Sequence, residues 1–190
     1  MSTGKLILHS NWVQPSIMET RLLVDYLGDM KLIGEPLAKD KEQFLTGERF
    51  LQLVSFVGCS TNVCLTPKPG NDRNFCSIAI TGPLQQPTLV WDSNCRPPRC
   101  PDCKTPIINW QQHIELGKLK CIQCSKELQL GEISWGRQAG YGRIFIEISN
   151  IFPGEARPTQ ILLEDLTRTT GTDWSYFYIQ SEKITLKHSV

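Results

Sequence analysis

The 190-residue sequence lacks most of the features by which a catalytic function is recognised. It has only three histidines (His9, His113 and His188), and none stands beside a nucleophile and an acid in the sequence. A hydrolase with a Ser-His-Asp or Cys-His assembly is therefore disfavoured. Gly140-Tyr-Gly142 precedes an expected strand, so we interpret it as a turn with a surface tyrosine; a phosphate-binding loop would need a helix N-terminus. We identify no catalytic residue and favour a protein that is not an enzyme.

Long apolar runs are also missing. No stretch approaches the roughly 20 residues that a transmembrane helix needs. Residues 1–9 have too short an apolar stretch for a signal peptide and no small-residue cleavage site. Eight cysteines are many, but a secreted disulfide scaffold is typical of shorter chains that carry a signal. We therefore predict a cytoplasmic protein with no membrane partner, and no small-molecule substrate can be identified.

The most specific feature present is a pair of Cys-x-x-Cys motifs. Cys100-Pro-Asp-Cys103 and Cys121-Ile-Gln-Cys124 are separated by seventeen residues, a spacing typical of zinc sites with four cysteine ligands. Two thiolates on one tight turn can hold the same ion at about 2.3 Å, and the second pair leaves no open position. The predicted cofactor is zinc, bound by these four cysteines in a structural rather than a catalytic site.

This segment resembles the zinc-ribbon superfamily over roughly residues 95–130. The resemblance rests on Cys100–Lys104, on an expected hairpin with Ile107, Ile108 and Trp110, and on Lys120–Cys124. It implies two knuckles joined by short antiparallel strands. Ribbons of this kind commonly bind nucleic acid or proteins, and many only stabilise an enzyme. Rubredoxin-like iron sites usually have glycine after the second cysteine of each knuckle. Lys104 and Ser125 stand there, which favours zinc over the iron alternative.

The formal net charge of +1 conceals an uneven distribution. Residues 95–143 contain eight basic and four acidic residues, so this segment carries +4 and the rest of the chain −3. Such a local excess permits contact with a polyanion without requiring it. We predict a possible contact surface formed by Arg96, Arg99, Lys104, Lys118 and Lys120.

For Cys59, Cys64 and Cys95, a buried or harmless thiol is the preferred interpretation over a redox or catalytic role.

Hydrophobic patterning predicts an α+β fold: a mixed sheet with an N-terminal helix and an inserted zinc ribbon with four cysteine ligands. Ser16 and Glu19 form a capping-box pattern, and apolar residues at helical spacing follow as far as Leu27. A second helix should begin after Thr159 and end near Gly171. It should connect two strands in one βαβ or split-βαβ unit. The expected strands are 50–57, 75–81, 88–91, 143–149 and 174–179.

The resulting organisation has three parts. Residues 1–94 hold the N-terminal helix and a first group of strands, residues 95–130 the inserted ribbon, and residues 131–190 the second strand-helix-strand part. Two functions fit this organisation. The first is a non-catalytic interaction module that binds protein or nucleic acid through the basic ribbon. The alternative is an enzyme or maturation factor whose ribbon is purely structural and whose pocket lies in the α+β domain.

Overall fold

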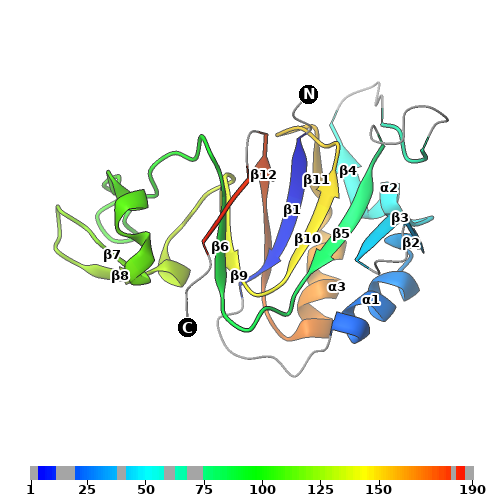
Figure 1. Ribbon diagram of the computed structural model, residues 1–190, viewed down its shortest axis with the longest axis horizontal. Helices are drawn as coiled ribbons and strands as arrows, with labels where there is room; N and C mark the ends of the chain where they lie inside the picture. The colour runs from blue at the N-terminus through cyan, green and yellow to red at the C-terminus, as the bar shows by residue number, and fades with distance from the viewer. Residues whose placement is uncertain are drawn as a thin grey trace.

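The computed structural model describes residues 4–11, 20–37, 42–57, 63–67, 75–180 and 183–186, and it confirms the α+β class (Figure 1). A six-stranded sheet is the largest element, with the strand order β12-β1-β10-β5-β3-β2. All of its neighbouring strands pair in antiparallel fashion. The strands are β1 (Lys5–Ser10), β2 (Ile33–Pro36), β3 (Gln43–Thr46), β5 (Ser77–Thr81), β10 (Phe145–Ser149) and β12 (Trp174–Ile179).

Strand β1 was not predicted from the sequence, although it lies inside the sheet between β10 and β12. Leu6 and Leu8 point to the face that the helices cover, and Ile7 belongs to the core of the opposite face. A strand buried on both faces lacks the alternation of a half-exposed strand, and its apolar run is only three residues long. His9 also lies in this strand and is buried.

The predicted split β-α-β unit is formed by β10, β12 and the helix α3 (Gln160–Thr170). Both strands are antiparallel to β1, which lies between them, so they are parallel to each other. The Thr159 hydroxyl accepts a hydrogen bond from the N–H of Leu162 at 3.3 Å, which caps the helix as expected. Gly171 ends it with φ of 68°, a conformation that favours glycine.

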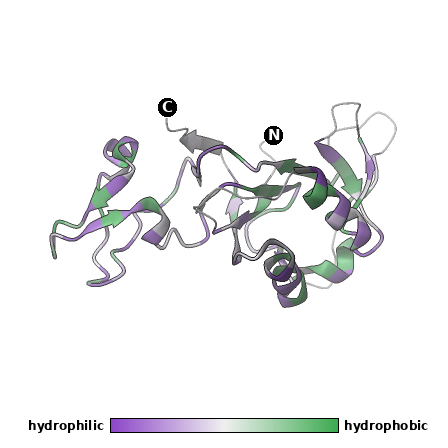
Figure 2. Ribbon diagram, turned by 90° about the horizontal axis from the view of Figure 1, so that it is seen from below, coloured by the Kyte–Doolittle hydropathy of each residue, from purple (hydrophilic) through white to green (hydrophobic). Residues whose placement is uncertain are grey.

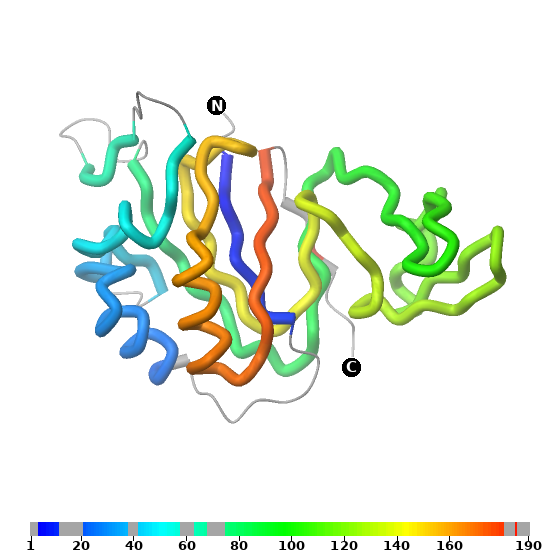
Figure 3. Tube along the Cα trace, turned by 180° about the vertical axis from the view of Figure 1, so that it is seen from behind, coloured from blue at the N-terminus to red at the C-terminus, as the bar shows by residue number. Residues whose placement is uncertain are grey.

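Helices α3 and α1 (Thr20–Asp29) cover one face of the sheet (Figure 3). Leu23 and Leu27 of α1 and Leu162 and Leu166 of α3 are fully buried against the sheet. Helix α1 confirms the predicted N-terminal helix. Its expected capping box at Ser16 and Glu19 lies outside the described residues.

The predicted strand over residues 50–57 was wrong in its first half. Residues Phe50–Leu53 form the one-turn helix α2, and only Val54–Phe56 form a strand, β4, which pairs with β11 (Ala156–Pro158). The N–H of Leu53 donates to the carbonyl of Arg49 at 3.0 Å, which closes the turn. A helical turn brings Phe50 and Leu53 to the same face, and both are buried in the core. The uninterrupted apolar run therefore fitted either structure.

A three-stranded sheet, β13-β6-β9, packs on the face of the large sheet that the helices leave open. It contains β6 (Thr88–Asp92), β9 (Ala139–Gly142) and β13 (Lys183–Leu186). Val90 of β6 joins Ile7, Phe145, Phe177 and Ile179 in the core between the two sheets. The expected turn at Gly140 is part of β9. Glycine is required there, because a Cβ at Gly140 would lie 2.5 Å from the Phe177 ring.

Between β6 and β9 the chain leaves the sheets and forms a separate projection, residues 93–138, here called the cysteine module (Figures 1 and 2). Because β6 and β9 are neighbouring paired strands, the two ends of the module lie side by side. The module contains the hairpin of β7 (Lys118–Lys120) and β8 (Glu127–Gln129), and three 3-10 turns, η1 (Trp110–Gln112), η2 (Ile114–Leu116) and η3 (Leu130–Glu132). None of the helices in the described part of the chain is long and apolar enough to cross a membrane.

Candidate metal centre and neighbouring surfaces

The two Cys-x-x-Cys motifs meet in space. The four Sγ atoms of Cys100, Cys103, Cys121 and Cys124 all lie within 4.8 Å of one another. Cys100 Sγ and Cys124 Sγ are 3.7 Å apart, and Cys103 Sγ and Cys121 Sγ are 3.5 Å apart. Disulfide sulfurs would be about 2.05 Å apart. Four sulfurs around one ion at about 2.3 Å would be separated by about 3.8 Å. The cluster therefore fits a tetrahedral metal ion and can hold one.

Each motif forms a knuckle with the same hydrogen bonds. In the first knuckle, Lys104 N–H donates to the Cys100 carbonyl at 3.0 Å, and Cys100 N–H donates to the Thr105 carbonyl at 3.0 Å. In the second, Ser125 N–H donates to the Cys121 carbonyl at 2.8 Å, and Cys121 N–H donates to the Lys126 carbonyl at 2.9 Å. The two halves of the site thus repeat one local structure, which places two ligands on each turn.

Lys104 and Ser125 adopt the left-handed conformation, with φ of 60° and 59°. These are the two positions after the second cysteine, where the sequence has no glycine. Left-handed backbone costs a residue with a side chain roughly 1–2 kcal/mol. The knuckle geometry is thus maintained against a local backbone preference, as expected where a bound ion fixes the turn.

The thiols of the cluster titrate unequally. Hydrogen bonds from the side chain and backbone of Thr105 lower the pKa of Cys103 to about 6. At Cys124 the backbone of Lys126 lowers the pKa, but contacts with Cys121 and the other two thiols, together with desolvation, outweigh it and raise the pKa to about 12. Gathering four thiolates without a cation is unfavourable because their charges repel, and a divalent cation would relieve this repulsion.

The cysteine module has an apolar core that is continuous with the small sheet. Leu119 of β7 and Leu128 of β8 are buried in the same cluster as Cys100 and Cys121. Trp110 packs edge-on against Trp91 of β6, with ring centroids 5.8 Å apart, and against Trp135 at 5.1 Å. The expected hairpin around Ile107, Ile108 and Trp110 was wrong. That segment leads into the turns η1 and η2, and the hairpin is formed by β7 and β8.

Three of the five predicted contact residues make contacts within the module. Lys118 pairs with Glu127 at 2.9 Å, the Lys104 ammonium donates to the Pro101 carbonyl, and Arg99 donates to the Lys104 carbonyl. Only Lys118 and Lys120 line the groove described next. Arg96 is exposed, and its backbone N–H donates to the Gln138 side chain. Outside the predicted set, Lys126 pairs with Asp102 and Arg143 is buried.

A groove of 540 Å³ opens on the cysteine module, and the sequence did not reveal it. Its exposed lining includes Ile108, Leu116 and Ile122, whose exposed fractions are 63%, 72% and 86%. Ile122 lies between the two cysteines of the second knuckle, so its exposure follows from the turn that presents the thiolates. Lys118 and Lys120 lie along the same groove. A cluster of large exposed aliphatic side chains is typical of a surface that binds a partner.

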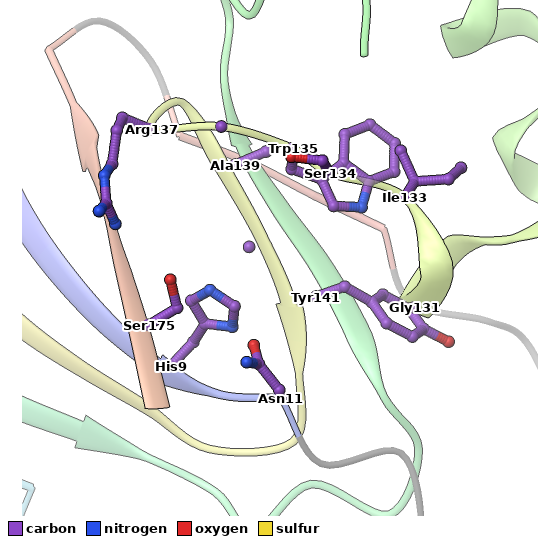
Figure 4. A pocket seen from close by; sticks show the side chains of 12 residues that line it. His9, Asn11, Gly131, Ile133, Ser134, Trp135, Arg137, Ala139, Tyr141 and Ser175 are labelled. Carbon is purple, nitrogen blue, oxygen red and sulfur yellow. The ribbon is translucent and has the colours of Figure 1, made fainter. Parts of the chain in front are cut away.

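A second cavity of 390 Å³ lies where the cysteine module meets the sheets (Figure 4). It is lined by His9 and Asn11 at the end of β1, by Ser175 of β12, by β9, and by residues of the 131–137 segment. His9 is buried between the rings of Phe145 and Phe177, and burial lowers its pKa to about 4. Backbone groups of Tyr141 and Ser10 oppose this shift, but Nδ1 makes no hydrogen bond of normal geometry among the described residues.

The other cysteines and histidines that the structure describes do not join the metal cluster. The Cys95 thiol donates to the Arg96 carbonyl, and burial raises its pKa to about 11. Cys64 donates to the Thr66 carbonyl. His113 is exposed and lines the groove. Cys59 and His188 lie outside the described residues.

Comparison of the chain with protein-family models, with curated proteins and with solved structures finds no match.

Proposed function

We propose that the cysteine module binds one zinc ion and acts as a protein-interaction module. The fit of the four sulfurs to a closed tetrahedral site supports zinc, which commonly occupies all-cysteine sites of this spacing. In such a site all four positions belong to the protein, so the metal would stabilise the module and present its outer surface. Left-handed Lys104 and Ser125 in place of glycines favour zinc over iron.

The observation that carries the interaction role is the groove with Ile108, Leu116 and Ile122. These side chains are more than half exposed on a small module, although burying each against a partner would gain roughly 1.5–3 kcal/mol. Lys118 on the same groove is paired with Glu127, so Lys120 would be the residue that favours an acidic neighbour beside the apolar side chains of a partner segment.

A protein partner is favoured over nucleic acid because the basic groups are largely engaged within the module. Lys118 and Lys126 each pair with an acid, and Lys104 and Arg99 donate to backbone carbonyls. Phosphate binding would have to break these contacts and would bring phosphates close to Asp102 and Glu127. An apolar groove offers little to a phosphate backbone but suits apolar side chains of a protein.

The test compares capture of partners from lysate by the wild type and by Leu116→Ser/Ile122→Ser. Ile161→Ser is the matched control, since Ile161 has a similar exposed fraction of 60% but lies on α3. We expect the groove variant to lose specific partners while keeping its metal and fold, and the control to keep them. The captured species should be proteins that survive nuclease treatment.

A different result would reject the proposal in a defined way. Identical partner lists for the wild type and groove variant would exclude the groove as an interface. Loss of partners in Arg96→Gln/Arg99→Gln/Lys120→Gln alone, together with nuclease sensitivity and a steep salt dependence, would restore the nucleic-acid hypothesis.

The second candidate function is the enzyme or maturation factor with a structural zinc module. The cavity at the junction favours it, because a buried histidine with a lowered pKa lines that cavity and such groups occur often at functional sites. Among the described residues of the cavity, however, no carboxylate is available to orient His9 as a catalytic base. We therefore rank this candidate second.

A further inference from the structure

The junction cavity is a site in its own right, separate from the groove and the metal. Its volume of 390 Å³ lies within the range typical of small-molecule pockets and is too small for a folded partner. Six of its twelve lining residues come from residues 131–137, the segment by which the cysteine module returns to β9. The others come from β1, β9 and β12 and from Asn11, so the cavity is complete only when the module is in place.

His9, which lines the cavity, has a buried polar atom without a partner. Its Nδ1 makes no hydrogen bond among the described residues. His9 also stands where the alternation of β1 would place an apolar residue, on the face that carries Ile7. Uncompensated polar groups of this kind in a rigid central strand call for an explanation other than stability, and a binding site provides one.

The cavity is electropositive. Among the residues that the structure describes, His9, Arg137 and Tyr141 are the ionisable groups that line it, and no carboxylate does. Burial keeps His9 neutral at pH 7 and raises the pKa of Tyr141, which therefore stays protonated. Arg137 is then the only charged group in the described lining, which favours an entering anion.

Arg137 is held in a fixed position. One guanidinium nitrogen donates to the Tyr176 carbonyl at 2.8 Å, and the guanidinium lies 3.7 Å from the centre of the Tyr176 ring. These contacts use one of its five N–H donors and leave others for a ligand. In Figure 4 Arg137, Ser175 and His9 lie on one side of the cavity, and Trp135 and Tyr141 lie on the other. Ser175 and His9 are directly paired across β12 and β1.

We propose that this cavity binds a small anionic molecule with a planar apolar body, its carboxylate or phosphate placed against Arg137 and Ser175 and its planar part toward Trp135 and Tyr141. The guanidinium fork matches both kinds of anion, and the hydroxyl of Ser175 adds a donor. Aromatic side chains opposite a single charge suit a ligand that is charged at one end only.

The test is calorimetric titration of the purified full-length protein with benzoate, phenyl phosphate, the neutral benzamide and inorganic phosphate. We expect saturable binding of benzoate or phenyl phosphate at least tenfold tighter than that of benzamide. Whichever of the two anions binds more tightly identifies the anionic group of the ligand as a carboxylate or a phosphate. Arg137→Gln should weaken the preferred anion at least tenfold, and Arg137→Lys should restore part of the loss. Arg168→Gln, which removes an exposed arginine on α3, should change nothing.

Ser134→Phe keeps the proposal testable if the Arg137 variants do not fold, since Ser134 is exposed and a ring there should fill the cavity. We expect this variant to lose anion binding and keep the wild-type melting temperature. Equal affinity for benzoate, phenyl phosphate and benzamide, no saturable binding, or unchanged binding in Ser134→Phe would overturn the proposal. If inorganic phosphate bound as tightly as phenyl phosphate, the proposed planar apolar body of the ligand would be overturned.

Discussion

The helix-covered sheet and the cysteine module are stabilised in different ways. The core under α1 and α3 contains twenty-two buried residues from eleven strands and helices and the loops between them, nearly all aliphatic or aromatic. The cluster of the module contains twelve, of which two are cysteines of the metal site and three belong to β6 and β9. Hydrophobic burial alone can therefore account for the sheet, whereas we expect the module to depend on metal binding and on its neighbours.

The joint between the two regions is itself apolar. Trp91 of β6 contacts Trp110 of the module, and Leu89 and Ala139 belong to the same cluster. Loss of the metal should then reach β6 and β9 but stop before the core beneath the helices. The junction cavity lies at this joint, so binding of the proposed ligand would depend on whether the module is folded.

The largest effect should come from removing the metal or a buried ligand. We expect about one zinc ion per chain by elemental mass spectrometry and almost none in Cys100→Ser. Structural zinc contributes on the order of 10 kcal/mol to the folding of small ribbons. Hydrogen exchange after chelation should therefore show loss of protection over residues 93–138 and in the adjoining strands β6 and β9.

Cys95→Ser is the control for this experiment, since Cys95 lies outside the cluster, and it should keep both metal and protection. Retained protection in β1 and β10 would sharpen the contrast between the regions. A single collapse of the whole chain on chelation would show that the module and the sheet form one cooperative unit.

The next largest effect should come from the core of the large sheet. Ile146 is fully buried in β10, and Ile146→Ala should lower the free energy of unfolding by roughly 2–5 kcal/mol. Zinc content should stay the same, because the module does not share this cluster. Chemical denaturation and metal analysis of one sample would check both; loss of zinc in the folded variant would contradict the separation of the two cores.

The sequence predicted the parts of the fold that have strong local signals. Thr159 and Gly171 marked the ends of α3, and the cysteine spacing identified the four residues that meet in the cluster. It failed where local patterns are ambiguous. The run from Phe50 to Phe56 fits a helix or a strand, and the three-residue run in β1 gave no alternation to detect.

The surfaces could not be predicted because they depend on long-range packing. Ile122 stands between two cysteines, and only the knuckle turn shows that its side chain faces solvent. His9 and Arg137 are 128 positions apart in the sequence and meet because the module returns to β9 beside β1 and β12. The basic residues were visible in the sequence, but their pairing with Glu127 and Asp102 was not.

Protonation of His9 in the large sheet should have an effect on stability that is similar to that of Ile146→Ala or smaller. The pKa of His9 is about 4 in the folded chain and 6.5 in the unfolded chain. Below pH 6.5 the unfolded chain therefore binds more protons, so stability is complete above pH 6.5 and falls until about pH 4, by roughly 3 kcal/mol in all. His9→Met, which cannot titrate, should show a shallower fall in denaturation curves between these values. Equal slopes for the two proteins would show that His9 does not control acid sensitivity.

The smallest effect should come from the knuckles, where the comparison can be refined at one residue. Ser125 has φ of 59°, and Ser125→Gly would remove a strain of roughly 1–2 kcal/mol. Glycine also raises the conformational entropy of the unfolded chain, which costs roughly 1 kcal/mol, so the net gain should be below about 1 kcal/mol. The gain should appear as slower zinc loss to a chelator, with the unfolding of the large sheet unchanged. Ser93→Gly is a suitable control because Ser93, also in the module, is not among the residues with positive φ. Faster zinc loss from Ser125→Gly would mean that the serine side chain itself supports the site.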